Sequence, residues 1–290
     1  MHSVGLVLHP MRDSESAVTA VLDWATHKGI EVLGIKDEIR RIQCAAIAVT
    51  AKELGRRADL VVSLGGDGTM LRAMRIADGQ RATVLGVNLG KLGFLAEVDV
   101  PDLANALSAI DDKKFTIEPR LAVDAEIAGQ VFTAFNDVAV VRFPGHATAA
   151  VALEVGGHPF VRYAADAVVV ATPTGSTAYS FSAGGPIVSP SVEALLVTPA
   201  APHSAYNRGL VLSVQDSLAL EILPRSGRLA VEVDGQVAAH LEPGDRISLR
   251  PRPGAARVVR LGLTTFYERA QRKLRLTDSA EIPVSLPPVL

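Results

Sequence analysis

The sequence predicts an α/β domain with a parallel sheet, then an antiparallel β-sandwich-like domain, with a last helix returning to the first domain. Up to about Leu95, apolar runs alternate with helix-like stretches, the pattern of βαβ units. From Phe115 onwards, short β runs follow one another closely with glycine turns between them, as in stacked antiparallel sheets. A helix-like stretch over 266–274 interrupts this run. We therefore expect an α/β domain over residues 1–110 with a returning segment 265–282, and a β-rich domain over 111–264.

The elements expected in the first domain follow from hydrophobic periodicity. Short apolar runs predict buried strands, and longer amphipathic stretches predict helices. In chain order they are strand 4–8, a helix around 14–28, strand 30–35, a long helix near 39–57, strand 60–64, a helix over 70–77 and strand 83–87.

The second domain is expected to consist mainly of short strands joined by tight turns. Gly129, Gly156-Gly157 and Asp234-Gly235 mark hairpins, and Asp-Gly is the strongest of these signals. The proline-rich residues 283–290 are expected to form a loose tail. The predicted strands are 121–127, 131–135, 151–155, 160–163, 167–171, 210–214, 218–223, 229–233, 246–250 and 258–263.

Charge and composition exclude several classes of protein. The 290 residues carry a formal net charge of −2, which gives no basic surplus for nucleic acid or an anionic membrane surface. Cys44 is the only cysteine, so disulfides within the chain and cysteine-based zinc sites are excluded. The seven histidines lack paired ligand spacing, and no apolar run reaches membrane-spanning length. We expect a cytoplasmic protein with no nucleic-acid or membrane partner.

Residues 65–69 read Gly-Gly-Asp-Gly-Thr between a predicted strand and a predicted helix. Free N–H groups and the helix dipole favour an anion there, so Gly65, Gly66, Gly68 and Thr69 are expected to bind phosphate. Asp67 would repel that phosphate unless it takes a proton from a hydroxyl about to be phosphorylated, or holds the accompanying magnesium ion. The loop therefore indicates phosphoryl transfer. The alternative is a tight turn with Thr69 or Asp67 as the helix cap.

A second glycine turn, residues 88–95, follows the next predicted strand. It lies at the carboxyl end of a parallel strand, where open α/β sheets bind ligands, and Asn88 offers a hydrogen bond there. A Walker A loop is excluded because Leu92 stands where Ser or Thr is required. The dinucleotide-binding glycine motif is excluded because Leu71 occupies its third glycine position.

Asn136 and Asp137 interrupt an otherwise apolar β stretch. Two polar residues at such a place must find partners or reach solvent. One interpretation is a β-bulge or a solvated strand end. The other is a pair that binds sugar hydroxyls, since a carboxylate accepts hydrogen bonds and an amide both donates and accepts.

Residues 172–180, Thr-Pro-Thr-Gly-Ser-Thr-Ala-Tyr-Ser, are the richest polar segment of the chain. Neutral donors and acceptors suit ribose, amide and phosphate groups, and Tyr179 offers a stacking face. A serine nucleophile is possible, but no G-x-S-x-G elbow surrounds Ser176. A capped helix after a proline turn accounts for Pro173 but not for this density of hydroxyls.

In this order, these segments resemble the NAD kinase family. The Gly-Gly-Asp-Gly-Thr loop alone is shared with diacylglycerol and sphingosine kinases and approximately with phosphofructokinases. Asn136 and Asp137 together with the 172–179 segment are more specific. The likeness covers nearly the whole chain, with matches at 65–69, 86–95, 136–137, 172–182, 184–186, 202–204 and 266–269.

The resemblance implies transfer of a phosphoryl group from ATP or polyphosphate to the 2′-hydroxyl of the adenosine ribose of NAD, giving NADP. It also implies Mg²⁺ or another divalent cation with ATP, a homodimer or homotetramer, and an α/β domain joined to a β-rich domain. By the same likeness, Asp67 is the base, the Asn136–Asp137 pair contacts a ribose, and Asp166 lies near the nicotinamide. The residues implied to bind NAD are Gly68, Asn88, Asn136, Asp137, Asp166, Thr174, Ser176, Thr177, Ala178 and Tyr179; no metal ligands are identified.

Three positions depart from the family pattern. Asp137 stands where glutamate is frequent, Ala167 where glycine is usual, and Gly209 where proline is more usual. If the usual glycine requires a positive φ, Ala167 would strain its turn. None of the three changes removes a proton-transfer group.

Two alternative functions share parts of these motifs. A lipid kinase of the diacylglycerol type would share the glycine loop, but the hydroxyl-rich segment favours a polar sugar over a lipid. A non-catalytic dinucleotide sensor would gain nothing from Asp67 in a phosphate loop. Production of NADP from NAD separates the kinase from both.

Overall fold

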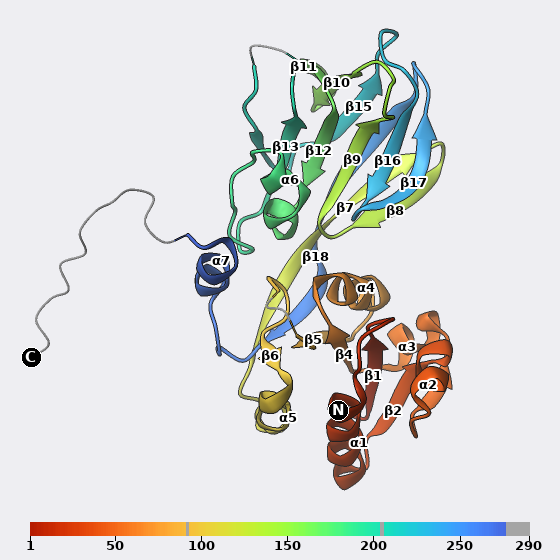
Figure 1. The fold of residues 1–290 in the computed structure, drawn as a ribbon, viewed down its shortest axis with the longest axis vertical. Helices are drawn as coiled ribbons and strands as arrows, with labels where there is room; N and C mark the ends of the chain where they lie inside the picture. The colour runs from red at the N-terminus through yellow and green to blue at the C-terminus, as the bar shows by residue number, and fades with distance from the viewer. Residues whose placement is uncertain (91–92, 204–205, 277–290) are drawn as a thin grey trace, which may run out of the picture.

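The structure, a computed structural model, describes residues 1–90, 93–203 and 206–276. Its N-terminal half is a parallel sheet in the order β5-β4-β1-β2-β3, flanked by helices (Figure 1). The strands are β1 (Ser3–Leu8), β2 (Glu31–Ile35), β3 (Ile47–Val49), β4 (Leu60–Gly65) and β5 (Thr83–Asn88), with a short β6 (Val98–Asp99) beside β5. The helices are α1 (Glu15–Lys28), α2 (Lys36–Ile42), α3 (Ala51–Arg57), α4 (Asp67–Ala77) and α5 (Leu103–Asp111).

The prediction of one long helix near 39–57 is wrong. Helix α2 ends where Gln43 takes a left-handed conformation with φ 52°. The chain then forms β3, which pairs in parallel with β2, and α3 begins at Ala51 with Thr50 as its N-cap residue. Thr50 and Glu53 form a reciprocal capping box, which is a helix start signal visible in the sequence. The prediction followed the apolar spacing instead and placed no helix start there.

The C-terminal half is a sandwich of two antiparallel layers, as predicted. One layer contains β7 (Thr116–Ile127), β8 (Gln130–Ala134), β10 (Ala149–Val155), β11 (His158–Ala165), β15 (Leu218–Ile222) and β18 (Arg246–Arg260). The other has the order β14-β13-β12-β9-β16-β17, formed by β14 (Leu210–Ser213), β13 (Ala194–Ala200), β12 (Ala167–Ala171), β9 (Asp137–Arg142), β16 (Leu229–Val233) and β17 (Gln236–Leu241). Buried side chains of both layers, such as Val140, Val168, Val151 and Ile247, belong to one core.

The two halves share a sheet, because β18 crosses from one to the other. Two strands were predicted at 246–250 and 258–263, but the structure has one strand with a register shift between Arg252 and Ala256. Near its end β18 pairs in parallel with β5 through Val258 and Val84, whereas its first residues pair antiparallel with β15. Figure 1 shows β7 and β18 running from the lower half of the molecule into the upper half. A continuous hydrogen-bonded sheet therefore connects the two regions.

The last described helix, α7 (Phe266–Leu274), returns to the first region as predicted. Arg269 on this helix is 1% exposed and donates to the carbonyl oxygen of Phe94 at 3.2 Å. Residues 277–282 of the predicted returning segment and the predicted tail 283–290 lie outside the described residues. Across the described ranges, no helix has the length and apolar character needed to cross a bilayer.

Candidate active site

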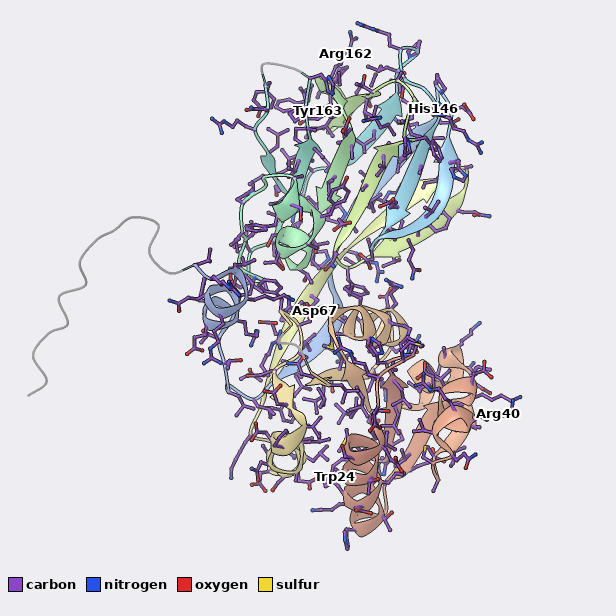
Figure 2. The ribbon with its side chains drawn as sticks, in the orientation of Figure 1. Trp24, Arg40, Asp67, His146, Arg162 and Tyr163 are labelled. Atoms are coloured by element: carbon purple, nitrogen blue, oxygen red, sulfur yellow. The ribbon has the colours of Figure 1, made fainter. Side chains whose placement is uncertain are left out.

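The Gly-Gly-Asp-Gly-Thr loop joins β4 to α4 at the carboxyl edge of the parallel sheet. Gly65 ends the strand, Gly66 is the N-cap residue and Asp67 is the first residue of α4. The N-cap glycine has no side chain to cap this helix start, and the first N–H groups of a helix have no partner within it, as an anion site requires. Figure 2 shows Asp67 near the middle of the molecule, where the parallel sheet meets the sandwich.

Asp67 is held by the second glycine turn. Its two carboxylate oxygens accept hydrogen bonds from the backbone N–H groups of Phe94 at 3.1 Å and Leu95 at 3.0 Å. A third donor, the Lys273 ammonium, lies 3.1 Å from Oδ2. A Cβ atom on Gly93 would lie 2.2 Å from Asp67 Oδ1, so only glycine permits this approach. The alternative in which Asp67 serves simply as a helix cap does not account for these contacts.

Asn88, at the end of β5, carries an unsatisfied buried oxygen. The residue is 3% exposed, and its Oδ1 has no hydrogen-bond partner within residues 1–90, 93–203 and 206–276. The backbone N–H of the next residue, Leu89, donates to the Gly65 carbonyl at 3.1 Å, which joins the two turns. Lys91 and Leu92 of the second turn lie outside the described residues.

Arg12 is a cation at this edge that the sequence reading missed. It follows β1, and its Nη1 donates to the Leu89 carbonyl at 3.3 Å. The same nitrogen would lie 3.4 Å from a Cβ on Gly90 and 4.0 Å from one on Gly66, so it faces both turns. Its position directly after the first parallel strand was the available signal, since ligand-binding groups collect at that edge.

The Asn136–Asp137 pair lies where β8 gives way to β9, and Asp234 fixes its backbone. The Asp234 carboxylate, with its side chain fully buried, accepts from the backbone N–H groups of Phe135 at 3.1 Å, Asn136 at 2.7 Å and Asp137 at 3.1 Å. It also pairs with Arg75 of α4 at 3.1 Å. The Asp234-Gly235 hairpin was predicted, and both residues have positive φ in the structure. The role of Asp234 in holding the Asn136–Asp137 pair was not predicted.

Asp137 is a buried acid with a strongly altered proton affinity. Burial, followed by the neighbouring Asp234 and Glu232 carboxylates, raises the pKa of Asp137 to about 7, although a backbone hydrogen bond from Tyr179 opposes this rise. Near neutral pH both protonation states of this side chain are therefore populated. The burial of Asp137 shows that it is not at a solvated strand end.

The hydroxyl-rich segment packs directly against the Asn136–Asp137 turn. The Asn136 carbonyl accepts from the Thr172 N–H at 2.9 Å, and a Cβ on Gly175 would lie 2.0 Å from that carbonyl oxygen. Half-buried Tyr179 packs on the outer face of the six-stranded sheet against a cluster that includes Val169 and Ala139. The sequence-predicted residues 136–137 and 172–179 are thus brought together.

The hydroxyls of this segment are not equally available to a ligand. The Ser176 hydroxyl is fully buried, donates to the Pro173 carbonyl at 2.7 Å and accepts from the Val188 N–H at 3.0 Å. Buried Thr174 accepts from Arg120 at 3.0 Å, another cation that the sequence reading missed. Thr177 and Ala178 are half-buried, and the Ala178 N–H is already bonded to Gly175. Ser176 therefore shapes the segment, whereas Thr177, Ala178 and Tyr179 retain exposed surface.

Asp166 lies at the opposite end of β12 from Thr172. Five strand residues separate them, about 20 Å at roughly 3.3 Å per residue. Arg142 donates to Asp166 at 2.5 Å, and this bond holds the pKa of the carboxyl below its ordinary value. His203 lies 3.9 Å away, while Ser204 falls outside the described residues. Ala167 is an ordinary strand residue without positive φ, so alanine causes no strain there.

The acids of the site are dispersed and do not form a metal cage. No group of three or more His, Cys, Asp or Glu side chains suited to a metal ion occurs within the described ranges. The Asp67 carboxylate is an oxygen donor of the kind that Mg²⁺ prefers. Asp67 is the acid of the phosphate loop itself.

A glycine-flanked helix start that carries an acid, beside a hydroxyl-rich segment on a β-sandwich, is typical of a phosphotransferase. The chain matches the ATP-NAD kinase N-terminal domain over residues 4–115 and the ATP-NAD kinase C-terminal domain over 135–261. It therefore belongs to the NAD kinase family, whose members phosphorylate NAD to NADP.

Individual relatives agree with this assignment. NAD kinase 1 of Streptomyces avermitilis is 36% identical over 95% of this chain and 88% of its own length. An NAD kinase of Desulforamulus reducens is also 36% identical, over 95% of this chain and 98% of its own. Among solved structures, yeast NADH kinase complexed with NADH has a TM-score of 0.86 at 25% identity, covering 98% of this chain and 90% of that one. An Archaeoglobus fulgidus NAD kinase complexed with ATP shares the fold, with a TM-score of 0.75 at 24% identity over 94% and 98%.

Proposed function

We propose that this chain transfers the γ-phosphoryl group of ATP to the 2′-hydroxyl of the adenosine ribose of NAD, with Asp67 as the general base. The observation that carries this proposal is the placement of Asp67. It begins α4 at an anion-binding helix start, and its carboxylate is oriented by the Phe94 and Leu95 N–H groups. A carboxylate in such a loop would repel a bound phosphate, so its placement favours a role in proton transfer over a role in phosphate binding.

The chemistry follows from this placement. Asp67 takes the proton of the ribose hydroxyl while the oxygen of that hydroxyl forms a bond to the γ-phosphorus. The bond from that phosphorus to the β,γ-bridging oxygen breaks, and ADP leaves with the bonding electron pair. The N–H groups of Gly66, Gly68 and Thr69 orient the donor phosphates. Magnesium, when bound with ATP, neutralises phosphate charge and needs no dedicated protein cage.

NAD is proposed to lie over the outer face of the six-stranded sheet. Asn136 and Asp137 would contact ribose hydroxyls, Thr177, Ala178 and Tyr179 would line the adenosine side, and Asp166 would face the nicotinamide end. Support comes from the packing of 172–179 against 136–137 and from the span of β12 between Thr172 and Asp166. Asn88, with its unpartnered buried Oδ1, supplies a further acceptor on the phosphate side.

Three further features belong to the proposal. We infer a cytoplasmic location from the single cysteine, and ATP or polyphosphate as the phosphoryl donor. A homodimer or homotetramer is supported by apolar side chains on edge strands, since Val131 of β8 is 62% exposed and Val237 of β17 is 59% exposed. Light scattering of the purified chain measures the oligomeric state.

The test is direct assay of purified protein with NAD, ATP and magnesium, with NADP detected by an NADP-specific dehydrogenase. Parallel reactions replace ATP by polyphosphate, NAD by NADH, and all substrates by a diacylglycerol with ATP. We expect NADP only with a phosphoryl donor. Calorimetric binding of NAD without formation of NADP would contradict the proposal and identify a sensor.

A further inference from the structure

Lys273 reaches the phosphate loop from the opposite end of the chain. It lies in the last turn of α7, and its Nζ is 3.1 Å from Asp67 Oδ2, across 206 residues of sequence. The same ammonium lies 4.6 Å from the centroid of the Phe94 ring. Phe94 is also the residue whose N–H donates to that carboxylate oxygen. The lysine therefore has two favourable partners at one point, an ion pair and a cation–π contact.

The position of α7 is built into the fold. Thr265 and Glu268 form a capping box at its start. Buried Arg269 donates to the Phe94 carbonyl at 3.2 Å and to the Thr264 carbonyl at 2.7 Å. The Glu97 carboxylate also accepts the backbone N–H of Leu263 at 2.7 Å. The last turn of the helix is thus directed to the Asp67 loop by contacts that do not involve Lys273.

Among residues 1–90, 93–203 and 206–276, the donors to Asp67 occupy three of its acceptor positions. A carboxylate has about four such positions. Oδ2 uses two of them, for Phe94 and Lys273, and Oδ1 uses one, for Leu95. Within this part of the chain, one position on Oδ1 is left for a substrate proton, and donors on both oxygens fix the group.

We propose that Lys273 is a positioning residue that holds the Asp67 carboxylate in the orientation needed to receive the hydroxyl proton of the acceptor. The inference rests on the proposed role of Asp67 as the base. Lys273 contributes through Asp67, by removing rotational freedom from the carboxylate and directing its open position on Oδ1 toward the acceptor. Small errors in such alignment cost about 100-fold in rate.

A purely stabilising ion pair does not explain this arrangement as well. The Lys273 and Asp67 side chains are 34% and 28% exposed, and ion pairs open to solvent contribute little to stability. The contacts of Arg269 and Glu97 already fix the helix. Removal of the ammonium is therefore expected to change turnover far more than stability.

The test compares Lys273→Met with Arg272→Met, its exposed neighbour on the same helix, and with Lys273→Arg. We expect Lys273→Met to lower kcat by about 10- to 100-fold, with KM for NAD and for ATP within about twofold of the parent. Its thermal midpoint should match that of Arg272→Met, whose kcat stays normal. Lys273→Arg should recover most of the activity, and ethylamine should restore turnover to Lys273→Ala in a saturable manner.

Two results would overturn the inference. One is a kcat for Lys273→Met equal to that of Arg272→Met. The other is a loss of kcat in Lys273→Met matched by a lower thermal midpoint, together with no restoration of Lys273→Ala by ethylamine. Asp67→Asn is assayed in parallel to separate this inference from the proposed function. If Asp67→Asn is inactive while Lys273→Met is normal, only the role of Lys273 fails. If Asp67→Asn retains full turnover, the role of Asp67 as the base fails as well.

Discussion

The loop around Asp67 and the turn around Asp137 each present a carboxylate to the proposed site, in opposite surroundings. Asp67 is partly exposed, and its hydrogen-bond partners in the described part of the chain are two backbone N–H groups and an ammonium. Asp137 is buried close to the Asp234 carboxylate, and its pKa is raised to about 7. The first environment fixes the orientation of a carboxylate through donors on both of its oxygens. The second disfavours the charged form of a carboxyl, through burial and a neighbouring carboxylate.

The largest effect is expected from Asp67→Asn, which tests the catalytic role proposed for the Asp67 loop. If Asp67 is the base, the amide should reduce kcat by about 100-fold or more, because it cannot accept the hydroxyl proton. NAD affinity should change little, since binding is assigned to the other region. Steady-state kinetics and calorimetry measure the two quantities, with Asp112→Asn at the exposed end of α5 as the control. Unchanged turnover would refute the role of Asp67.

Gly93→Ala tests whether the Asp67 loop depends on close backbone approach. A methyl group would stand 2.2 Å from Asp67 Oδ1, so the carboxylate must move. We expect kcat to fall about 10- to 100-fold with a smaller effect on KM for NAD. Gly227→Ala is the matched control, because its added Cβ would make only ordinary contacts from 3.7 Å. Equal kinetics for the two variants would show that the carboxylate tolerates the displacement.

Asp137→Asn sharpens the contrast through pH. The parent ionises as pH rises through about 7, and the ionised form accepts hydroxyl hydrogen bonds, so KM for NAD should fall across this range. The amide should flatten this dependence and raise KM at pH 8 by about 3- to 10-fold.

The same variant makes a prediction for stability. Because the folded-state pKa of Asp137 lies above its unfolded value of about 3.9, the free energy of unfolding of the parent should decline as pH rises from about 4 to 7. The Asp137→Asn substitution would remove that contribution, because an amide does not titrate. Denaturant unfolding at pH 5 and pH 8 measures the free energy of unfolding. The same change between the two pH values in parent and variant would contradict the description of Asp137 as a buried acid.

The smallest effect is expected from Arg75→Met, which breaks the ion pair between α4 and Asp234. The three backbone N–H groups still donate to the fully buried Asp234 carboxylate, so the substitution removes only one of the groups that hold it. KM for NAD should rise about two- to fivefold with kcat nearly constant. Arg40→Met, on α2 away from the site, serves as the control (Figure 2). A larger loss of kcat than of affinity would mean that α4 transmits the change to Asp67.

Local patterns carried most of the prediction. Strand β12 and helix α7 were predicted with their observed bounds, because each forms a short periodic run between clear turn signals. The glycine loop and Asn88 were found because ligands collect at the carboxyl edge of a parallel sheet. The prediction of one long helix over 39–57 is wrong because the apolar spacing of this segment fits a helix, whereas pairing with β2 makes its middle a strand.

Contacts between distant residues could not be predicted in the same way. Lys273 and Asp67 are 206 residues apart, and Arg75 and Asp234 are 159 apart. Asp234 was visible only as part of a hairpin signal, and Lys273 as one charge on an amphipathic helix. Nothing in local periodicity specifies which buried carboxylate or which loop such a side chain will meet.

The late arrival of Lys273 has a consequence for synthesis of the chain. The ribosome makes Asp67 206 residues before the lysine that it binds, a delay of about 10–40 s at roughly 5–20 residues per second. Strand β18, which completes the shared sheet beside β5, also emerges only after residue 246. A nascent chain can therefore form the β4–α4 turn early, whereas the contact with Lys273 and the pairing of β18 with β5 form only after those later residues have been made.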